Sequence, residues 1–281
     1  MGQGLMTKIS QIAANELGLS TDEIKITSTD TEKVPNTSAS AASASTDING
    51  AAVVNAINTI KNNLASFINK NFKYKGKSIK YKSNKVLFGS KSIDFKKLIS
   101  LAHLNRISLS SSGFYKTPKI FRNKETLKGR PFLYFSYGAA VSEVIIDTLT
   151  GENKLLQVDI LHDVGKSINP SIDLGQIEGG FVQGLGWLTT EEVSWNLNGN
   201  LSTHSPSTYK IPVSKDIPEK FNVNIYEKGL NIEKTVNRSK AVGEPPLMLA
   251  LSTFMALKNA VNNNNLKAPA TPENILMALQ E

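Results

Sequence analysis

Apolar positions recur along the chain at the three-to-four-residue spacing that places them on one face of a helix. The first such stretch, Gly2–Leu17, ends at Gly18, a residue that tolerates the left-handed conformation common after a helix. A longer stretch follows Ser45, Thr46 and Asp47, three residue types that cap helix N-termini. In full, the spacing predicts helices over Gly2–Leu17, Ala51–Ile68, Phe95–Leu104, Ile172–Thr190, Pro245–Val261 and Pro272–Leu279.

Alternating polar and apolar positions predict strands between these helices. The segment Glu23–Ser28 alternates over its whole length, and Phe132–Asp147 and Lys154–Asp163 are two β-rich runs. The turn between the two runs contains Gly151, which predicts a hairpin. Helices and antiparallel strands are therefore mixed along the chain, which is typical of an α+β fold.

The chain has 281 residues, 40% of them hydrophobic and 20% charged, as in folded globular proteins. This length is enough for one large domain or two modest ones. We expect one domain over residues 1–281, with two subdomains over 1–110 and 111–281 as the alternative. We expect no secretory signal and no membrane partner, because no apolar run approaches the ~18 residues of a membrane-spanning helix. The absence of cysteine excludes disulfides, thiolate nucleophiles and cysteine-bound zinc or iron–sulfur clusters, and it favours a cytoplasmic location.

The net charge of +8 comes from one lysine-rich window. Residues 70–97 contain ten lysines and a single acid, Asp94, and therefore carry a net charge of +9. In the run Lys73–Lys82 the lysines alternate with other residues, which favours a solvated edge strand with its lysines facing outward. Phe72, Tyr74 and Tyr81 are interleaved with them, as in proteins that bind single-stranded nucleic acid. Because no other nucleic-acid motif accompanies this window, we do not expect nucleic-acid binding.

The sequence gives little support to a metal site or a nucleophile built from side chains alone. The three histidines, His103, His162 and His204, are too far apart for a metal-ligand spacing. The Gly-x-Ser-x-Gly turn that presents a nucleophilic serine is also missing. A metal that works with this chain is therefore expected to bring its own ligands.

The segment Ser239–Leu247 is the most unusual local sequence, because Glu244 precedes two prolines. A residue before proline is biased to extended geometry, and the prolines favour the first turn of the helix that follows. The carboxylate of Glu244 is thus expected at a helix N-terminus, a placement that suits a general base. The alternative is a glutamate that only begins a helix.

Two glutamines and a run of small residues form a second set of candidate binding groups. Gln3 lies between two glycines, and Gln176 lies in a glycine-containing predicted helix. Each carboxamide offers a donor and an acceptor on one edge, which complements the amide edge of a flat heterocycle. The small residues of 41–45 leave room for a planar molecule and lead into a helix N-terminus that suits a phosphate.

Six segments that occur in order carry a resemblance to a known family. They are Met1–Leu5, Pro35–Gly50, Gly113–Tyr115, Gly165–Pro170, Gly175–Gly184 and Gly243–Leu247. With them, the chain resembles the C-terminal part of the molybdenum-binding, molybdopterin-binding domain of the xanthine dehydrogenase and aldehyde oxidase family. The resemblance covers almost the whole chain and is weakest in the lysine-rich window.

The resemblance implies a molybdenum–molybdopterin cofactor and gives roles to particular residues. Glu244 matches the catalytic base of the family, and Ala41 and Ala42 match small residues of the substrate pocket. Ala42 would also lie near the molybdenum, without a side-chain ligand to it. Contacts to the pterin and its phosphate are implied for Gly2, Gln3, Ser43, Ala44, Ser45 and Gln176.

The implied reaction is the oxidation of hypoxanthine or xanthine to urate by a molybdenum hydroxylase. Oxidation of aldehydes or other N-heterocycles stays open, as does a non-catalytic remnant or basic binding module. Electrons would leave through a 2Fe–2S centre and FAD on a partner chain or domain, with NAD as the acceptor. The expected partners are the N-terminal half of the molybdenum domain, the iron–sulfur/FAD subunit and a purine substrate. The chain by itself is expected to be inactive.

Overall fold

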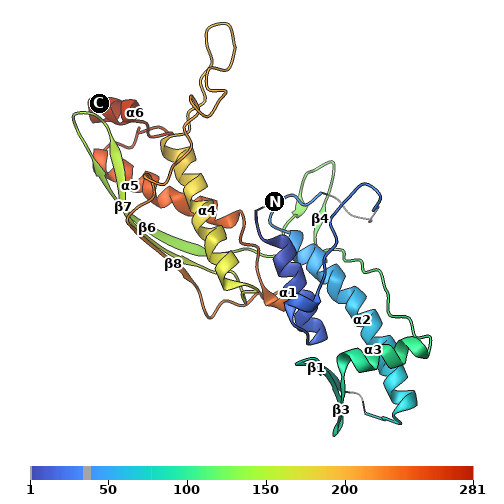
Figure 1. Cartoon of the computed structure of the whole chain (residues 1–281). Coiled ribbons are helices and arrows are strands. Elements are labelled where there is room, and N and C mark those ends of the chain that lie inside the picture. Colours follow the sequence, from blue (N-terminus) through green and yellow to red (C-terminus); the bar gives the residue numbers. More distant parts are fainter. Residues whose placement is uncertain (1, 34–38, 77, 281) are drawn as a thin grey trace. The chain divides into compact units, whose positions relative to one another are not determined.

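The computed structural model describes residues 2–33, 39–76 and 78–280 (Figure 1). The predictions that concern Met1 and residues 35–38 therefore lie outside the described residues.

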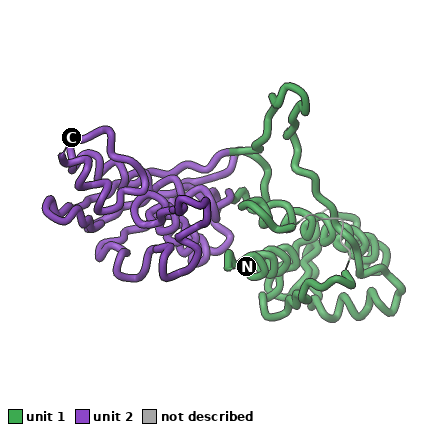
Figure 2. Tube along the Cα trace, turned by 90° about the horizontal axis from the view of Figure 1, so that it is seen from above, with its two compact units in different colours: residues 1–134, 232–239 green, residues 135–231, 240–281 purple. Residues whose placement is uncertain are grey.

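The chain divides into two compact units (Figure 2). Each unit has its own hydrophobic core. Unit 1 contains residues 1–134 and 232–239, and unit 2 contains residues 135–231 and 240–281.

Unit 1 is built on the long helix α2 (Ser45–Asn71), against which α1 (Leu5–Leu17) packs. Gly50 permits the close approach of the two helices, since a Cβ built on it would lie 2.9 Å from Cδ1 of Ile12. Helix α1 ends as predicted, because Gly18 has a φ of 66° and its N–H group donates to carbonyl oxygens of the last turn.

The start of α2 differs from the sequence prediction. The N-cap residue is Ala44, which makes no side-chain cap hydrogen bond. Ser45, Thr46 and Asp47, which were expected as caps, instead form the first turn of the helix. Residue type alone predicted a cap at any of three adjacent positions, and the backbone turns into the helix before all of them.

A three-stranded antiparallel sheet packs against α2. Its strands β1 (Ile79–Lys82), β2 (Lys85–Phe88) and β3 (Lys91–Asp94) lie in that order, and α3 (Phe95–Leu104) follows. The core between them consists of Leu64, Phe67, Ile68, Val86, Phe88, Leu98 and Ala102. On the edge strand β1 the two lysines are exposed, while Ile79 and Tyr81 are half-buried. The predicted solvated edge strand is confirmed for Ile79–Lys82, but residues 73–76 of the predicted run form no strand.

The segment after α3 returns along α2. The side-chain amide of Asn55 donates to the carbonyl oxygen of Phe114 at 2.8 Å. The side-chain amide of Asn63 donates to the carbonyl oxygen of Ser108 at 3.1 Å. A short ladder of β4 (Phe121–Arg122) and β5 (Gly129–Arg130) follows, and the 3₁₀-helix η2 (Val236–Arg238) completes the unit. Because α2 holds this return segment, residues 111–134 belong to unit 1 and the units part at 134/135.

Unit 2 is built on a mixed three-stranded sheet. Strands β6 (Gly138–Ile146) and β7 (Asn153–His162) pair antiparallel, which confirms the predicted hairpin. Strand β8 (Lys220–Ile225), which the sequence analysis missed, pairs parallel to β7. The sheet is therefore not purely antiparallel.

Four helical elements accompany this sheet: α4 (Pro170–Thr189), the 3₁₀-helix η3 (Pro245–Ala250), α5 (Leu251–Val261) and α6 (Pro272–Gln280) (Figure 1). Helix α4 packs on the sheet, where the rings of Phe181 and Phe221 lie 5.5 Å apart. The predicted helix Pro245–Val261 exists as two elements, because a 3₁₀ turn with two prolines precedes the α-helix. The α+β class is confirmed.

One predicted strand is wrong. Residues 24–28 form no strand, although their polar and apolar residues alternate. Instead Glu23 ends the 3₁₀-helix η1 (Thr21–Glu23) and closes a capping box with Ser20. Local alternation is not sufficient for a strand, because a strand also needs a partner to pair its backbone.

Candidate functional site

The backbone around Glu244 is a tight turn rather than an extended segment. Pro245 and Pro246 occupy the first two positions of η3, as expected. Glu244 itself has φ −109° and ψ −37°, so the expectation of extended geometry before proline is wrong. The N–H group of Leu247 donates to the carbonyl oxygen of Glu244 at 3.1 Å, and this bond closes the turn. The side chain of Glu244 is exposed.

Helix α4 carries the glycine face on which this turn rests. A Cβ built on Gly180 would lie 3.1 Å from Cβ of Pro246, and one on Gly184 would lie 2.3 Å from the carbonyl oxygen of Leu247. Gln176 lies one helical turn before Gly180 on the same face and is half-buried. Unit 2 thus brings Gln176 and the Glu244 turn to the same side of α4.

The start of α4 is fixed by side chains of the Gly165–Pro170 motif. Asn169 is the N-cap, and its side-chain oxygen accepts from the N–H group of Ile172 at 3.1 Å. The hydroxyl of Ser167 donates to the buried carboxylate of Asp173 at 2.5 Å. These bonds orient the first turns of the helix and therefore Gln176.

The other predicted contact residues belong to unit 1. Gly2 and Gln3 form a turn that leads into α1, and Gln3 is half-buried. Ser43 and Ala44 form the turn before α2, and Ser45 is buried at its first position. The resemblance put all of these residues near one cofactor. The structure places each of them at the start of a helix.

The predicted substrate-pocket residues Ala41 and Ala42 are exposed. Ala42 has a φ of 58°, in the left-handed region that residues with a side chain rarely adopt. Such backbone strain is more frequent at functional sites than elsewhere.

Asp47, in the first turn of α2, has an unusual environment that the sequence analysis missed. Burial raises the pKa of its carboxyl group from the ordinary value of 3.8 to about 6. The hydroxyl of Tyr134 donates to this carboxyl group, and the charge of Lys8 also acts to lower its pKa. Tyr134 is 87 positions away in the sequence, so no local pattern identifies this pair.

The histidines are not brought together. His103 and His204 are exposed, whereas His162 is buried at 2% exposure, and neither of its ring nitrogens has a hydrogen-bond partner among the residues that the structure describes. Among the described residues, no group of three or more His, Asp or Glu side chains could hold a metal ion. Within the same residues, no helix is long and apolar enough to cross a membrane.

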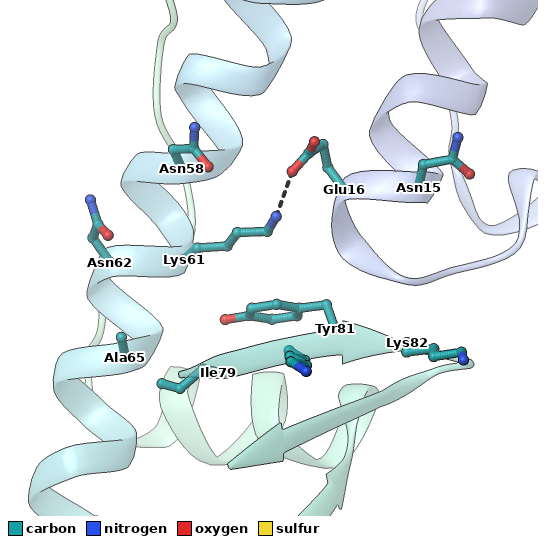
Figure 3. Close-up of a pocket in the computed structure, with 10 residues that line it drawn as sticks. Asn15, Glu16, Asn58, Lys61, Asn62, Ala65, Ile79, Tyr81 and Lys82 are labelled. Atoms are coloured by element: carbon teal, nitrogen blue, oxygen red, sulfur yellow. Dashed lines mark hydrogen bonds and ion pairs between the residues drawn. The ribbon is translucent and has the colours of Figure 1, made fainter. Parts of the chain in front are cut away.

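Unit 1 also contains a polar pocket of about 550 Å³ (Figure 3). None of the candidate residues above belongs to its lining. Nζ of Lys61 lies 2.6 Å from Oε2 of Glu16 and 5.2 Å from the ring centroid of Tyr81. Burial raises the pKa of Tyr81 to about 12. These contacts join α1, α2 and β1, so the pocket wall is part of the frame of unit 1.

Comparison with known proteins identifies the family. The family model of the molybdopterin cofactor-binding domain matches residues 1–218. The chain belongs to this family. The xanthine dehydrogenase/oxidase of Felis catus is 47% identical over 288 residues, which cover 98% of this chain and 20% of that protein. The xanthine dehydrogenase/oxidase of Gallus gallus is 47% identical over 285 residues, which also cover 98% of this chain and 20% of that protein. The chain thus spans about a fifth of the length of these relatives.

A solved structure shows the same fold. Quinoline 2-oxidoreductase from Pseudomonas putida 86 superposes with a TM-score of 0.84 at 21% identity, over 100% of this chain and 35% of that one. The resemblance drawn from the six ordered motifs is confirmed, and so is the molybdopterin class of cofactor. The roles of individual site residues stay predictions.

Proposed function

We propose that this chain is the part of a xanthine dehydrogenase that carries its catalytic base, Glu244, and part of its pterin-binding surface. The observation that carries the proposal is the Glu244 turn. Two prolines and the glycine face of α4 fix its backbone, while the carboxylate stays exposed to a bound molecule. The match of 98% of this chain to xanthine dehydrogenase supports hypoxanthine or xanthine as the substrate and urate as the product.

The residues of unit 2 fit a planar cofactor. A Cβ built on Gly175 or on Gly179 would meet no atom of the described part of the chain within 4 Å, so these residues leave the backbone of α4 accessible at both positions. Gln176 lies beside them and offers both a donor and an acceptor to the edge of a pterin. We propose that Gln176 binds this edge.

The residues of unit 1 fit an anionic group. The N-cap of α2, Ala44, makes no side-chain cap hydrogen bond, so its side chain does not occupy the N–H groups of the first turn. Such N–H groups and the helix dipole favour a phosphate. We propose that Ser43, Ala44 and Ser45 bind the cofactor phosphate, and that Gly2 and Gln3 contact the pterin.

The bound cofactor would supply the metal, the ligands of that metal and the redox chemistry. The chain's own residues would do the rest. A carboxylate oxygen of Glu244 would accept a proton as general base. The small side chains of Ala41 and Ala42 would leave room for a planar purine, with Ala42 next to the metal.

The remaining parts of the proposal concern groups outside this chain. With no cysteine to hold an iron–sulfur cluster, the electrons would pass to 2Fe–2S and FAD on a partner chain or domain, and then to NAD. The N-terminal half of the molybdenum domain would complete the substrate pocket. A cytoplasmic location stays a prediction.

The test is the Glu244→Gln variant in the enzyme that this chain forms with its iron–sulfur, FAD and N-terminal molybdenum segments. We expect its molybdenum content to be unchanged and urate formation from xanthine to fall by ~10²-fold or more. Glu227→Gln, an exposed glutamate of the same unit, is the matched control and should keep its rate. A Glu244→Gln enzyme that keeps most of its rate would remove Glu244 from the reaction. Oxidation of aldehydes but not xanthine would replace the proposed substrate.

A further inference from the structure

Lys240, four residues before Glu244, forms a largely buried ion pair with Asp163. Nζ of Lys240 lies 2.5 Å from Oδ2 of Asp163, and the two side chains are only 6% and 14% exposed. Asp163 directly follows the last residue of β7. Burial of two charges costs desolvation free energy that their attraction often does no more than offset, so such a pair is weak as a source of stability. The effect of the ion pair on the position of the backbone is therefore more informative than its contribution to stability.

The pair fixes the backbone at the start of the Glu244 segment. The N–H group of Lys240 donates to the carbonyl oxygen of Val164 at 2.8 Å. The hydroxyl of Ser136 donates to the carbonyl oxygen of the next residue, Ala241, at 3.0 Å. The side chain and the backbone of Lys240 thus both bind to the chain that leaves β7.

Asp163 is itself held in place, so Lys240 binds to a rigid partner. Its Oδ1 accepts from the N–H group of Gly165 at 2.7 Å, and its own N–H group donates to the carbonyl oxygen of Tyr137 at 2.8 Å. Nζ of Lys240 also lies 4.7 Å from the centroid of the Tyr137 ring. A Cβ built on Gly229 would lie 2.4 Å from Oδ1 of Asp163, so the neighbouring loop closes over the carboxylate.

The other end of the segment is held by α4. The carbonyl oxygen of Gly243 lies 3.7 Å from a Cβ built on Gly180, and Pro246 is closer still. Glu244 lies between these two anchors, with its backbone fixed on both sides. Loss of the first anchor would free the segment from residue 240 to the prolines, and the Glu244 carboxylate would move with it.

We propose that Asp163 and Lys240 are positioning residues, whose ion pair holds the segment 240–246 so that the Glu244 carboxylate keeps one place in unit 2. This inference rests on the proposed function of Glu244 as the base. A displacement of about 1 Å at a catalytic group can lower a rate ~10²-fold, so a fixed backbone is a requirement of the reaction.

The first test uses the 281-residue chain and does not depend on activity. Hydrogen exchange is measured at the amides of Val242, Gly243, Glu244 and Leu247. The variant is Asp163→Asn combined with Lys240→Met, which leaves no unpaired buried charge and keeps an acceptor for Gly165. We expect these amides to exchange at least tenfold faster, while β6 and β7 stay protected. Unchanged exchange would overturn the proposal.

The matched control is Lys154→Met, at an ion pair of β7. Its Nζ lies 3.3 Å from Oε1 of Glu219, and the two side chains are 55% and 84% exposed. An exposed ion pair of this kind contributes little to the stability of the fold. The control should leave the exchange of the segment unchanged, and an equal effect of both variants would overturn the proposal.

The second test is a double-mutant cycle in the loaded enzyme. The Asp163→Asn/Lys240→Met change should lower kcat about tenfold at constant molybdenum content and nearly constant KM, and should lower it no further when Glu244 is already Gln. An equal loss on both backgrounds would mean a merely structural role and would overturn the proposal. Faster exchange together with a fully active Glu244→Gln enzyme would instead reject the proposed base.

Discussion

Replacement of Asp47 by asparagine is expected to stabilise unit 1 at neutral pH. The buried carboxyl group has a pKa of about 6 in the folded chain, against an ordinary value of 3.8. The folded state therefore favours the protonated, neutral form. Above pH 6 the unfolded and folded carboxyl groups are both ionised, and the folded state bears the cost of burying the charge.

The magnitude follows from the pKa difference. A difference of about two in pKa corresponds to roughly 3 kcal/mol of stability that is present below pH 3.8 and is lost as the pH rises to about 6. Asparagine stays neutral and still offers an oxygen to the hydroxyl of Tyr134. Loss of a charge at a helix N-terminus offsets part of the gain, by about 0.3–1 kcal/mol. We expect a net gain of about 2 kcal/mol at pH 7 and none near pH 4.

Urea unfolding at several pH values between 4 and 8 measures this gain. Both tryptophans, Trp187 and Trp195, lie in unit 2, so their fluorescence reports that unit, while far-UV circular dichroism reports both units. The tryptophan transition should not move. Asp30→Asn, at a carboxylate that is 45% exposed, is the control and should change stability by less than about 0.5 kcal/mol. A stability loss at pH 7, or a gain that does not depend on pH, would refute the reasoning.

Two further predictions concern unit 2, and tryptophan fluorescence during urea unfolding measures both. Gly184→Ala should lower its stability by about 1–3 kcal/mol, because the new Cβ would lie 2.3 Å from the carbonyl oxygen of Leu247. Gly179→Ala, where a Cβ meets no atom, should instead raise it by about 0.5–1 kcal/mol, and equal effects would contradict the glycine-face argument. Burial lowers the pKa of His162 below 6.5, so the wild type should lose stability as the pH falls below 6.5. His162→Leu should remove that loss, and unchanged pH dependence would show that another group causes it.

The helices could be predicted from the sequence because their signals are local. The apolar face of α1 and its terminal Gly18 lie within one window, and the same is true of α3 (Phe95–Leu104), whose predicted bounds agree with the observed ones. Helix boundaries were less accurate, as the start of α2 at Ser45 shows. There the residue type was correct for a cap, but the turn of Ala42–Ala44 decides where the helix begins.

The strands depend on partners that local patterns do not reveal. Residues 24–28 and β8 (Lys220–Ile225) both alternate, yet only β8 pairs with another strand. In the sequence its partner β7 comes before α4 and β8 comes after it. Two parallel neighbouring strands require such a crossover connection. Alternation at Phe221, Val223 and Ile225 was a usable signal for β8, but only the pairing distinguishes it from 24–28.

The candidate site was found through the order of six motifs, not through geometry. Gln176 and Glu244 are 68 positions apart, and what relates them is the glycine face of α4 at Gly180, which no spacing rule predicts. The local rule for a residue before proline was wrong at Glu244, because the hydrogen bond from Leu247 closes a turn there. Tertiary contacts overrode a local bias at the residue proposed to be the base.

Glu244 combines a fixed backbone with an exposed side chain, and this combination bears on how a base would work here. A carboxylate in water is a weak base, and burial is what raises its basicity. Pro245, Pro246 and the ion pair at Lys240 fix the backbone, and the Glu244 residue is exposed, so burial would come from the molecule that binds against it. Under the proposed function, the loaded enzyme would therefore enclose Glu244 more fully than unit 2 does.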